Sequence, residues 1–146
     1  MDLVIRENPD LDEDKVVIEC RKLTSKYLKA IDILKAQDTI VVYKNASIYK
    51  IDVESIYYFE YVDRNVFVYT EENVYESKQM MNEIEEQMTN DFIRISRSQI
   101  LNIQHIESLK PIMNGRLEAR LHNDEKVIVS RQYVKTLKNK FLPGIV

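Results

Sequence analysis

The stretch Phe92-Ile-Arg-Ile-Ser-Arg-Ser-Gln-Ile-Leu-Asn102 decides how the remainder of the sequence is interpreted, because it interleaves five large apolar residues with two arginines and two serines. The apolar residues are too hydrophobic for a solvated loop, and the arginines are too basic for a core. Backbone geometry must therefore separate them, and their alternation predicts a strand that reaches a corner at Ser96-Arg97-Ser98. Ser98 is suited to cap a short helical turn over residues 99–102. Arg94 lies on the face opposite the neighbouring isoleucines and is expected to point into solvent.

Length and composition indicate one globular domain with a short appendage. The chain has 146 residues, of which 45% are hydrophobic and 31% are charged, as in soluble globular proteins. No segment approaches the ~20 consecutive apolar residues that span a bilayer, so we expect no membrane insertion. The N-terminus lacks a secretory signal and Cys20 is the single cysteine. Both features favour a reducing cytoplasm.

The net charge of -3 hides a division along the chain. From Phe92 onward there are ten basic and four acidic residues, a balance of +6, whereas the other 11 basic and 20 acidic residues give residues 1–91 a balance of -9. Such asymmetry is typical of a protein whose basic part meets a polyanion while its acidic part repels it.

Hydrophobic periodicity divides the chain into an N-terminal extension, residues 1–37, and a longer unit, residues 38–146. In the extension, apolar runs at 2–6 and 15–19 predict two strands, and apolar residues three and four positions apart predict a helix over about residues 22–37. We therefore expect a β-β-α extension with a role in dimerisation or sensing. From residue 38 onward, β-branched and aromatic residues alternate as in an antiparallel sheet. Strands are expected at residues 39–43, 47–51, 55–62, 66–69 and 74–77.

Turn and capping residues organise the rest of the chain. Asp63-Arg64-Asn65 is expected to form the exposed tip of a hairpin. Asn114-Gly115 predicts a second hairpin, because both residues accept positive φ in a type I′ turn. The remaining signals predict helices at residues 79–89 and 131–141, with boundaries at Asn90-Asp91, Ser130 and Pro143-Gly144.

The tyrosines and histidines fit structural roles better than chemical ones. Tyrosines recur within the expected strands, which favours packing over a platform that stacks single-stranded bases. His105 and His122 are remote from any Cys or carboxylate cluster with metal-ligand spacing, so no metal site is expected. With two glycines there is no glycine-rich phosphate loop, and there is no nucleophile-and-base motif. We expect neither a cofactor nor enzymatic activity.

Four segments, in their order and spacing, are similar to those of a known family. They are Ile56-Tyr-Tyr-Phe-Glu60, Phe92 to Asn102, Ile106-Glu-Ser-Leu109 and Val127-Ile-Val-Ser-Arg-Gln-Tyr-Val-Lys-Thr-Leu137. Over about residues 39–142 the chain resembles the LytTR family of bacterial DNA-binding domains. The resemblance implies a mainly β (α+β) fold of small antiparallel sheets with short helices. Residues 1–37 are too few for the receiver domain that often precedes this one.

The resemblance also implies a partner, duplex DNA bound through loops that enter successive major grooves. Carried over by position, the contacts fall on Arg64 and Asn65 at the hairpin tip, on Arg97, and on Arg131 after the last strand. An arginine fork can donate two hydrogen bonds to guanine or to phosphate, and asparagine can pair with adenine. Contacts to the DNA backbone that set register suit Ser96, Ser98, Lys135 and Lys138.

Two hypotheses from different classes follow. The first is a sequence-specific, double-stranded DNA-binding transcriptional regulator that acts as a homodimer on repeated half-sites. The second is a protein-interaction or ligand-sensing module that works through the acidic N-terminal unit. Specific DNA binding that weakens steeply with salt would favour the first, and no binding at low salt would favour the second.

Overall fold

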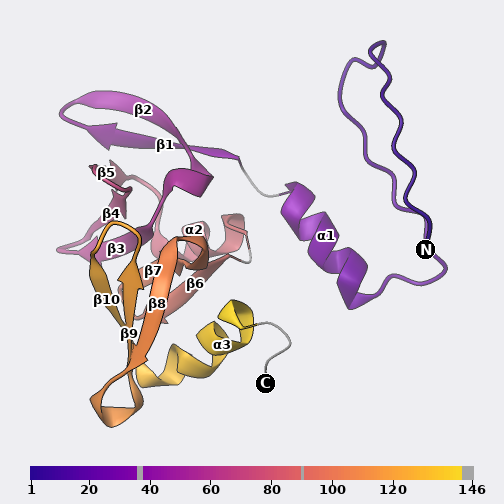
Figure 1. The fold of residues 1–146 in the computed structure, drawn as a ribbon. Coiled ribbons are helices and arrows are strands. Elements are labelled where there is room, and N and C mark those ends of the chain that lie inside the picture. The colour runs from indigo at the N-terminus through magenta and orange to yellow at the C-terminus, as the bar shows by residue number, and fades with distance from the viewer. Residues whose placement is uncertain (36–37, 90, 143–146) are drawn as a thin grey trace.

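Two antiparallel sheets and three helices make up the chain in the computed structural model, which describes residues 1–35, 38–89 and 91–142 (Figure 1). The larger sheet has the strand order β2-β1-β5-β4-β3-β7-β6 and the smaller sheet the order β10-β9-β8. The strands of the larger sheet are β1 Thr39–Lys44, β2 Ser47–Asp52, β3 Tyr58–Val62, β4 Asn65–Tyr69, β5 Val74–Ser77, β6 Phe92–Ser96 and β7 Gln99–Asn102. The smaller sheet consists of β8 Ile106–Pro111, β9 Leu117–Leu121 and β10 Lys126–Val129. The helices are α1 Ser25–Lys35, α2 Met81–Gln87 and α3 Arg131–Phe141, with short 3-10 turns at Val53–Ser55, Ile103–His105 and Met113–Gly115.

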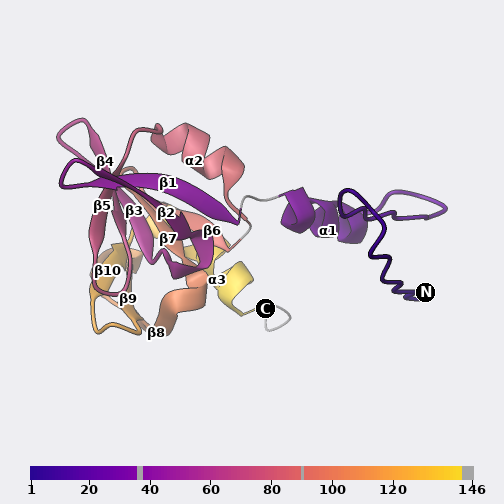
Figure 2. The ribbon, with the colours of Figure 1, turned by 90° about the horizontal axis from the view of Figure 1, so that it is seen from above.

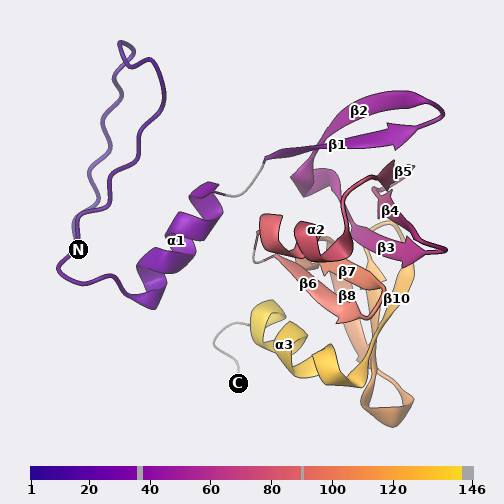
Figure 3. The ribbon, with the colours of Figure 1, turned by 180° about the vertical axis from the view of Figure 1, so that it is seen from behind.

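The larger sheet separates two hydrophobic cores. Side chains alternate between the two faces of a strand, so neighbouring residues of β3 and β7 enter different cores. Phe59 and Ile100 pack with α2 in one core, whereas Tyr58 and Leu101 pack with the smaller sheet and α3 in the other. Figure 3 shows α2 and α3 on opposite sides of β6 and β7. The mainly β architecture predicted from the sequence is confirmed.

The N-terminal extension differs from the prediction. Within residues 1–24 the structure has no strand, so the strands expected at 2–6 and 15–19 are wrong. Leu3, Val4 and Ile5 remain 85%, 69% and 80% exposed, and a two-stranded hairpin without a core to cover is only marginally stable in water. The predicted helix is present as α1, and its expected end at Gln37 lies outside the described residues. Figure 2 shows α1 and the residues before it to one side of the sheets.

The segment that follows Ser98 also differs from the prediction. Residues 99–102 form strand β7 rather than a helical turn, and they pair with both β3 and β6. Ile100 and Leu101 are each fully buried, in different cores. Successive side chains diverge by only about 100° in a helical turn but point to opposite faces in a strand, so burial in two opposite cores favours the strand.

The other predicted elements are observed. The Asn114-Gly115 hairpin joins β8 to β9, with φ of 66° and 72° at the two residues, although its loop includes Met113 as well. Asn90 and Pro143-Gly144 lie outside the described residues, but helix α2 ends at Gln87, earlier than the predicted end at Asn90-Asp91.

Candidate nucleic-acid interface

The β3–β4 turn presents Arg64 and Asn65 to solvent. Asp63 and Arg64 both have positive φ, 49° and 67°, as a tight hairpin turn between twisted strands requires. The Asn65 side chain donates a hydrogen bond over 3.1 Å to the carbonyl oxygen of Asp63. Among the described residues, none forms a hydrogen bond or ion pair with the Arg64 side chain. The predicted exposed tip is confirmed, with a free guanidinium at its end.

The β6–β7 corner holds Arg97 between two serines, as the sequence predicts. Local hydrogen bonds hold its backbone: the Ser98 amide donates to Oγ of Ser96 over 3.2 Å, and the Tyr61 amide donates to the Ser98 carbonyl oxygen over 2.8 Å. The Arg97 carbonyl oxygen accepts a hydrogen bond from Arg94. The Arg97 side chain is exposed and has no hydrogen-bond or ion-pair partner within the described ranges. The corner is thus fixed while its basic side chain stays available.

Arg131 begins α3 directly after the last strand. The Ser130 amide donates over 2.8 Å to the carbonyl oxygen of Ile95, which connects the end of β10 to the end of β6. Ser130 occupies the predicted N-cap position, but its side chain makes no capping hydrogen bond. The stem of Arg131 lies against Gly115 of the β8–β9 loop. Its guanidinium has no acidic partner in the part of the chain that the structure describes.

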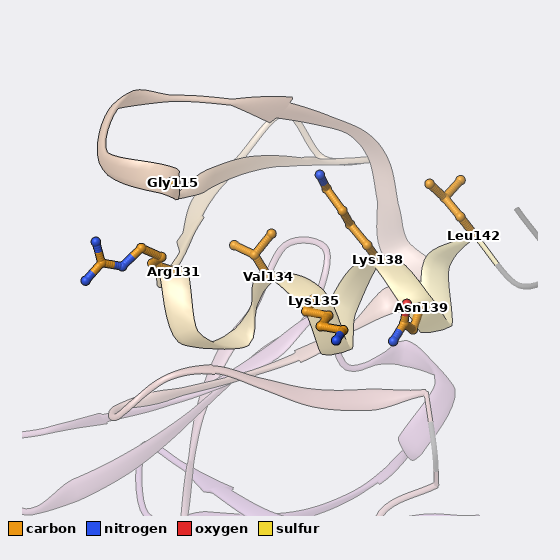
Figure 4. Close-up of a pocket in the computed structure, with 7 residues that line it drawn as sticks. All are labelled: Gly115, Arg131, Val134, Lys135, Lys138, Asn139 and Leu142. Atoms are coloured by element: carbon orange, nitrogen blue, oxygen red, sulfur yellow. The ribbon is translucent and has the colours of Figure 1, made fainter. Parts of the chain in front are cut away.

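A shallow basic groove of about 490 Å³ runs along α3 beside the β8–β9 loop (Figure 4). Arg131, Lys135 and Lys138 recur at spacings of four and three residues, which places them on neighbouring positions of the helix surface. Figure 4 shows the Lys138 side chain rising towards the loop and Arg131 extending past Gly115. The residues that line the groove are Gly115, Arg131, Val134, Lys135, Lys138, Asn139 and Leu142, and none of them is acidic.

Two hydrogen bonds gather the three corners at one end of the molecule. The Tyr61–Ser98 bond ties the β6–β7 corner to the end of β3, next to the turn that carries Arg64. The Ser130–Ile95 bond ties the start of α3 to the same end of β6. In Figure 3 the β3–β4 turn, the β6–β7 corner and the start of α3 follow one another down the right-hand edge. Arg64, Arg97 and Arg131 therefore share one edge, although the first and the last are 67 positions apart in the sequence.

Arg94 does not point freely into solvent. It lies on the face opposite Ile93 and Ile95, as predicted, but its side chain is only 20% exposed and forms an ion pair with Glu85 of α2 at 3.0 Å. The alternation of apolar residues gives the face of a side chain, and α2 covers that face here.

The described residues contain no site suited to a metal ion. Across residues 1–35, 38–89 and 91–142, no group of three or more His, Cys, Asp or Glu side chains could hold one. His105 instead stacks on Tyr57 with ring centroids 4.0 Å apart, and its Nε2 lies 2.6 Å from the carbonyl oxygen of Glu54. In the same ranges, no helix has the length and apolar character needed to cross a bilayer.

Comparison with known proteins identifies the family. The model of the LytTr DNA-binding domain matches residues 46–142, which is most of the chain. The chain belongs to the LytTr DNA-binding domain family. Two HTH-type transcriptional regulators of Staphylococcus aureus, from strains NCTC 8325 / PS 47 and COL, are each 31% identical to it over 113 residues, 77% of this chain and 77% of the relative.

A solved LytTr domain has the same fold. The LytTr DNA-binding domain of a methyl-accepting/DNA response regulator from Bacillus cereus superposes with a TM-score of 0.68 at 25% identity, and the match covers 74% of this chain and 99% of that domain. The LytTr resemblance derived from the four sequence segments is thus confirmed, and the chain contains a DNA-binding domain of this family.

The sequence indicates only a turn at Gly115. Its close approach to Arg131 joins two segments 16 positions apart. The Asn-Gly pair indicates positive φ but says nothing about the side chain that passes over it. The sequence also does not indicate the Arg94–Glu85 ion pair, because no periodic pattern shows which helix covers a strand.

Proposed function

We propose that this LytTr protein is a sequence-specific transcriptional regulator that reads the major groove of duplex DNA through turn residues. Arg97 and Arg131 contact base edges, and the Arg64–Asn65 turn makes a third contact. Ser96, Ser98, Lys135 and Lys138 bind phosphates. The observation that supports this most is the common edge, where corners held by backbone hydrogen bonds carry arginines that lack partners within the described residues.

The chemistry of this edge suits DNA. The arginine fork matches the O6 and N7 acceptors of guanine, and turns mounted on a rigid sheet hold the spacing between contacts. The basic groove along α3 offers cations to the adjacent phosphates. Strands separate each described helix from the next, so turns rather than a pair of adjacent helices carry the readers.

The finer features of the proposal concern assembly. Two copies bind repeated half-sites as a homodimer, and residues 1–37 serve dimerisation or sensing beside the DNA-binding unit of residues 38–146. The protein acts in the cytoplasm and has no catalytic role. The charge division supports DNA as the partner, because the part from Phe92 onward, which contains Arg97, Arg131, Lys135 and Lys138, carries a balance of +6.

A binding-site selection followed by a salt series tests the function. Full-length protein should enrich one sequence from a random duplex library, and its affinity should fall steeply as salt rises. Arg97→Ala and Arg131→Ala should each cost about 1 to 3 kcal/mol of specific binding. Arg120→Ala is the matched control, because Arg120 is paired with Glu107 and Asp124 beside the β9–β10 turn. Unchanged affinity in both test variants, with the fold intact, would remove these two residues from the interface.

One observation supports a second candidate, a protein-interaction or sensing module. Helix α1 has no buried residue, and its Leu28, Ile33 and Leu34 are 48%, 62% and 55% exposed. Absence of any duplex binding at low salt would favour this candidate over the first.

A further inference from the structure

The Arg94 side chain bridges two elements. Its Nε and Nη2 donate to the two carboxylate oxygens of Glu85 over 3.2 Å and 3.0 Å, and its Nη1 donates over 2.6 Å to the carbonyl oxygen of Arg97. One planar guanidinium therefore holds α2 with one side of its fork and the β6–β7 corner with the other.

Arg94 lies partly buried beneath α2, so its hydrogen bonds are more restricted than those of an exposed surface residue. Phe92 belongs to the α2 core, whereas Ile93 and Ile95 belong to the core of the smaller sheet, so Arg94 lies on the α2 face. Its side chain is 20% exposed, against 43% for Glu85. A partly buried, bidentate arginine–carboxylate pair is geometrically more restrictive than a freely exposed ion pair.

The corner needs such a support because pairing is irregular there. The register between β6 and β7 shifts between Arg94 and Ser96, which is the mark of a bulge. The Ser96 side chain fixes Ser98, and β3 fixes the Ser98 carbonyl, but Arg97 itself is held from outside the turn through its carbonyl oxygen by Arg94. The hydrogen bond from Arg94 therefore restrains the peptide plane between Arg97 and Ser98.

We propose that Arg94 is a positioning residue for DNA recognition, anchored by Glu85, and that it sets the trajectory with which Arg97 reaches its base. The proposal rests on the proposed function. It assigns no DNA contact to Arg94. Under this proposal, α2 contributes to base recognition through Glu85, although it lies on the far side of the sheet from α3.

Lysine cannot replace arginine in this bridge. A lysine ammonium is a point charge on a flexible stem and lacks the planar fork that spans a carboxylate and a carbonyl together. Arg94→Lys therefore preserves charge and removes the bridge, which makes it the variant that separates positioning from electrostatic attraction. Glu85→Gln removes the anchor and deletes a negative charge, so simple electrostatics would predict tighter DNA binding from it.

The test measures base preference with full-length protein and the duplex that the wild type selects. Each variant is titrated against that duplex and against duplexes altered at the base pair whose preference is lost in Arg97→Ala. We expect Arg94→Lys, Arg94→Gln and Glu85→Gln each to reduce discrimination at that base pair by about tenfold. Combined with Arg97→Ala, none of them should lower it further, since their effect passes through Arg97. Thermal unfolding of each variant confirms that it is folded.

The alternatives give different results. If Arg94 binds phosphate, Arg94→Gln weakens all duplexes alike and lowers the salt dependence, Arg94→Lys restores binding, and Glu85→Gln does not reduce discrimination; this pattern overturns the proposal. Additive effects in the Arg97→Ala background also overturn it. If wild-type protein selects no sequence, the proposed function fails and the positioning role fails with it. Should Arg94→Gln not fold, the half-exposed Glu85→Gln variant decides the outcome.

Discussion

A β-carbon added to Gly115 would lie 3.0 Å from Cδ and 3.1 Å from Cγ of Arg131, so the β8–β9 loop touches the side chain that begins α3. Gly115 also has a φ of 72°, a conformation that L side chains rarely adopt. The Arg131 stem can therefore follow its present path because Gly115 has no β-carbon.

Gly115→Ala should redirect Arg131 while the protein stays folded. The positive φ costs about 1 kcal/mol of stability with a β-carbon, and the flexible Arg131 stem moves away from the new methyl group. We expect specific DNA affinity to fall about tenfold, within the range of one lost base contact. Fluorescence anisotropy and urea unfolding measure the two effects. Asn114→Gly, which relaxes a neighbouring positive φ without adding atoms, serves as control; equal affinity of Gly115→Ala and wild type would show that the loop does not direct Arg131.

Lys135→Gln and Lys138→Gln should weaken binding to every duplex alike. Both lysines line the groove along α3, where a phosphate contact adds affinity but no base preference. Each substitution should reduce the slope of log affinity against log salt by about 1. Lys126→Gln is the control, because it makes the same charge change at the start of β10, whereas α3 follows the other end of that strand. It should leave the slope of log affinity against log salt unchanged. A change in base preference would place the lysines among the readers instead.

Asn102→Ala should destabilise the fold without a direct effect on DNA contacts. The buried Asn102 side chain donates over 2.9 Å to the carbonyl oxygen of Ile56 and accepts over 3.0 Å from the Gln104 amide. Truncation leaves both groups unpaired, which costs about 1 to 3 kcal/mol. Urea unfolding should report this loss, and Gln104→Ala, at an exposed side chain, should be nearly neutral. A loss below about 0.5 kcal/mol would show that water replaces both hydrogen bonds.

Stability should fall at alkaline pH, in part through Tyr58. Burial, followed by the Glu125 carboxylate, raises the pKa of Tyr58 above its ordinary value of 10.0. The folded state then holds the phenol proton more tightly than the unfolded state, so this contribution is complete below about pH 10 and is lost as the pH rises towards the raised pKa. Tyr58→Phe cannot ionise, and its free energy of unfolding should decline less between about pH 9 and pH 11. Parallel curves for the two proteins would exclude Tyr58 as the source.

Removal of residues 1–37 should reduce self-association. Helix α1 buries none of its residues, and apolar side chains exposed on a helix are typical of a surface that meets a partner. Sedimentation velocity should show a smaller species for the truncated chain, with the sheets still folded by circular dichroism. Leu34→Lys in the full chain should act in the same direction, whereas Lys29→Gln should not. An unchanged assembly state after truncation would rule out a role for the extension in dimerisation.

Local patterns predicted most of the sheets. Strands β1 to β5 and the turn at Asp63-Arg64 follow from alternation and turn residues that act within a few positions. The errors arose where the deciding partner is distant. Residues 2–6 contain an apolar run as a strand would but lack a core to cover, and residues 99–102 follow a serine as a helix would but are divided between two cores.

The candidate site shows the same limit. Arg64, Arg97 and Arg131 were each identified as corner residues from the sequence and the family resemblance. Their shared edge depends on the Tyr61–Ser98 and Ser130–Ile95 hydrogen bonds, which no local pattern indicates. Gly115 and Glu85 were missed for this reason, since each acts on a corner formed by another part of the chain.

The hydrogen bond between Ser130 and Ile95 joins the two sheets, and with them the corners that each sheet carries. Arg97 is mounted on the larger sheet, while Arg131 follows the last strand of the smaller one. In the proposed complex, the way in which the two sheets join therefore fixes the distance between the two arginines. The bases that the two arginines contact must lie at this distance, and the twist of the DNA between them sets their relative position. The protein would therefore discriminate between sequences of different twist, even at base pairs that no side chain touches.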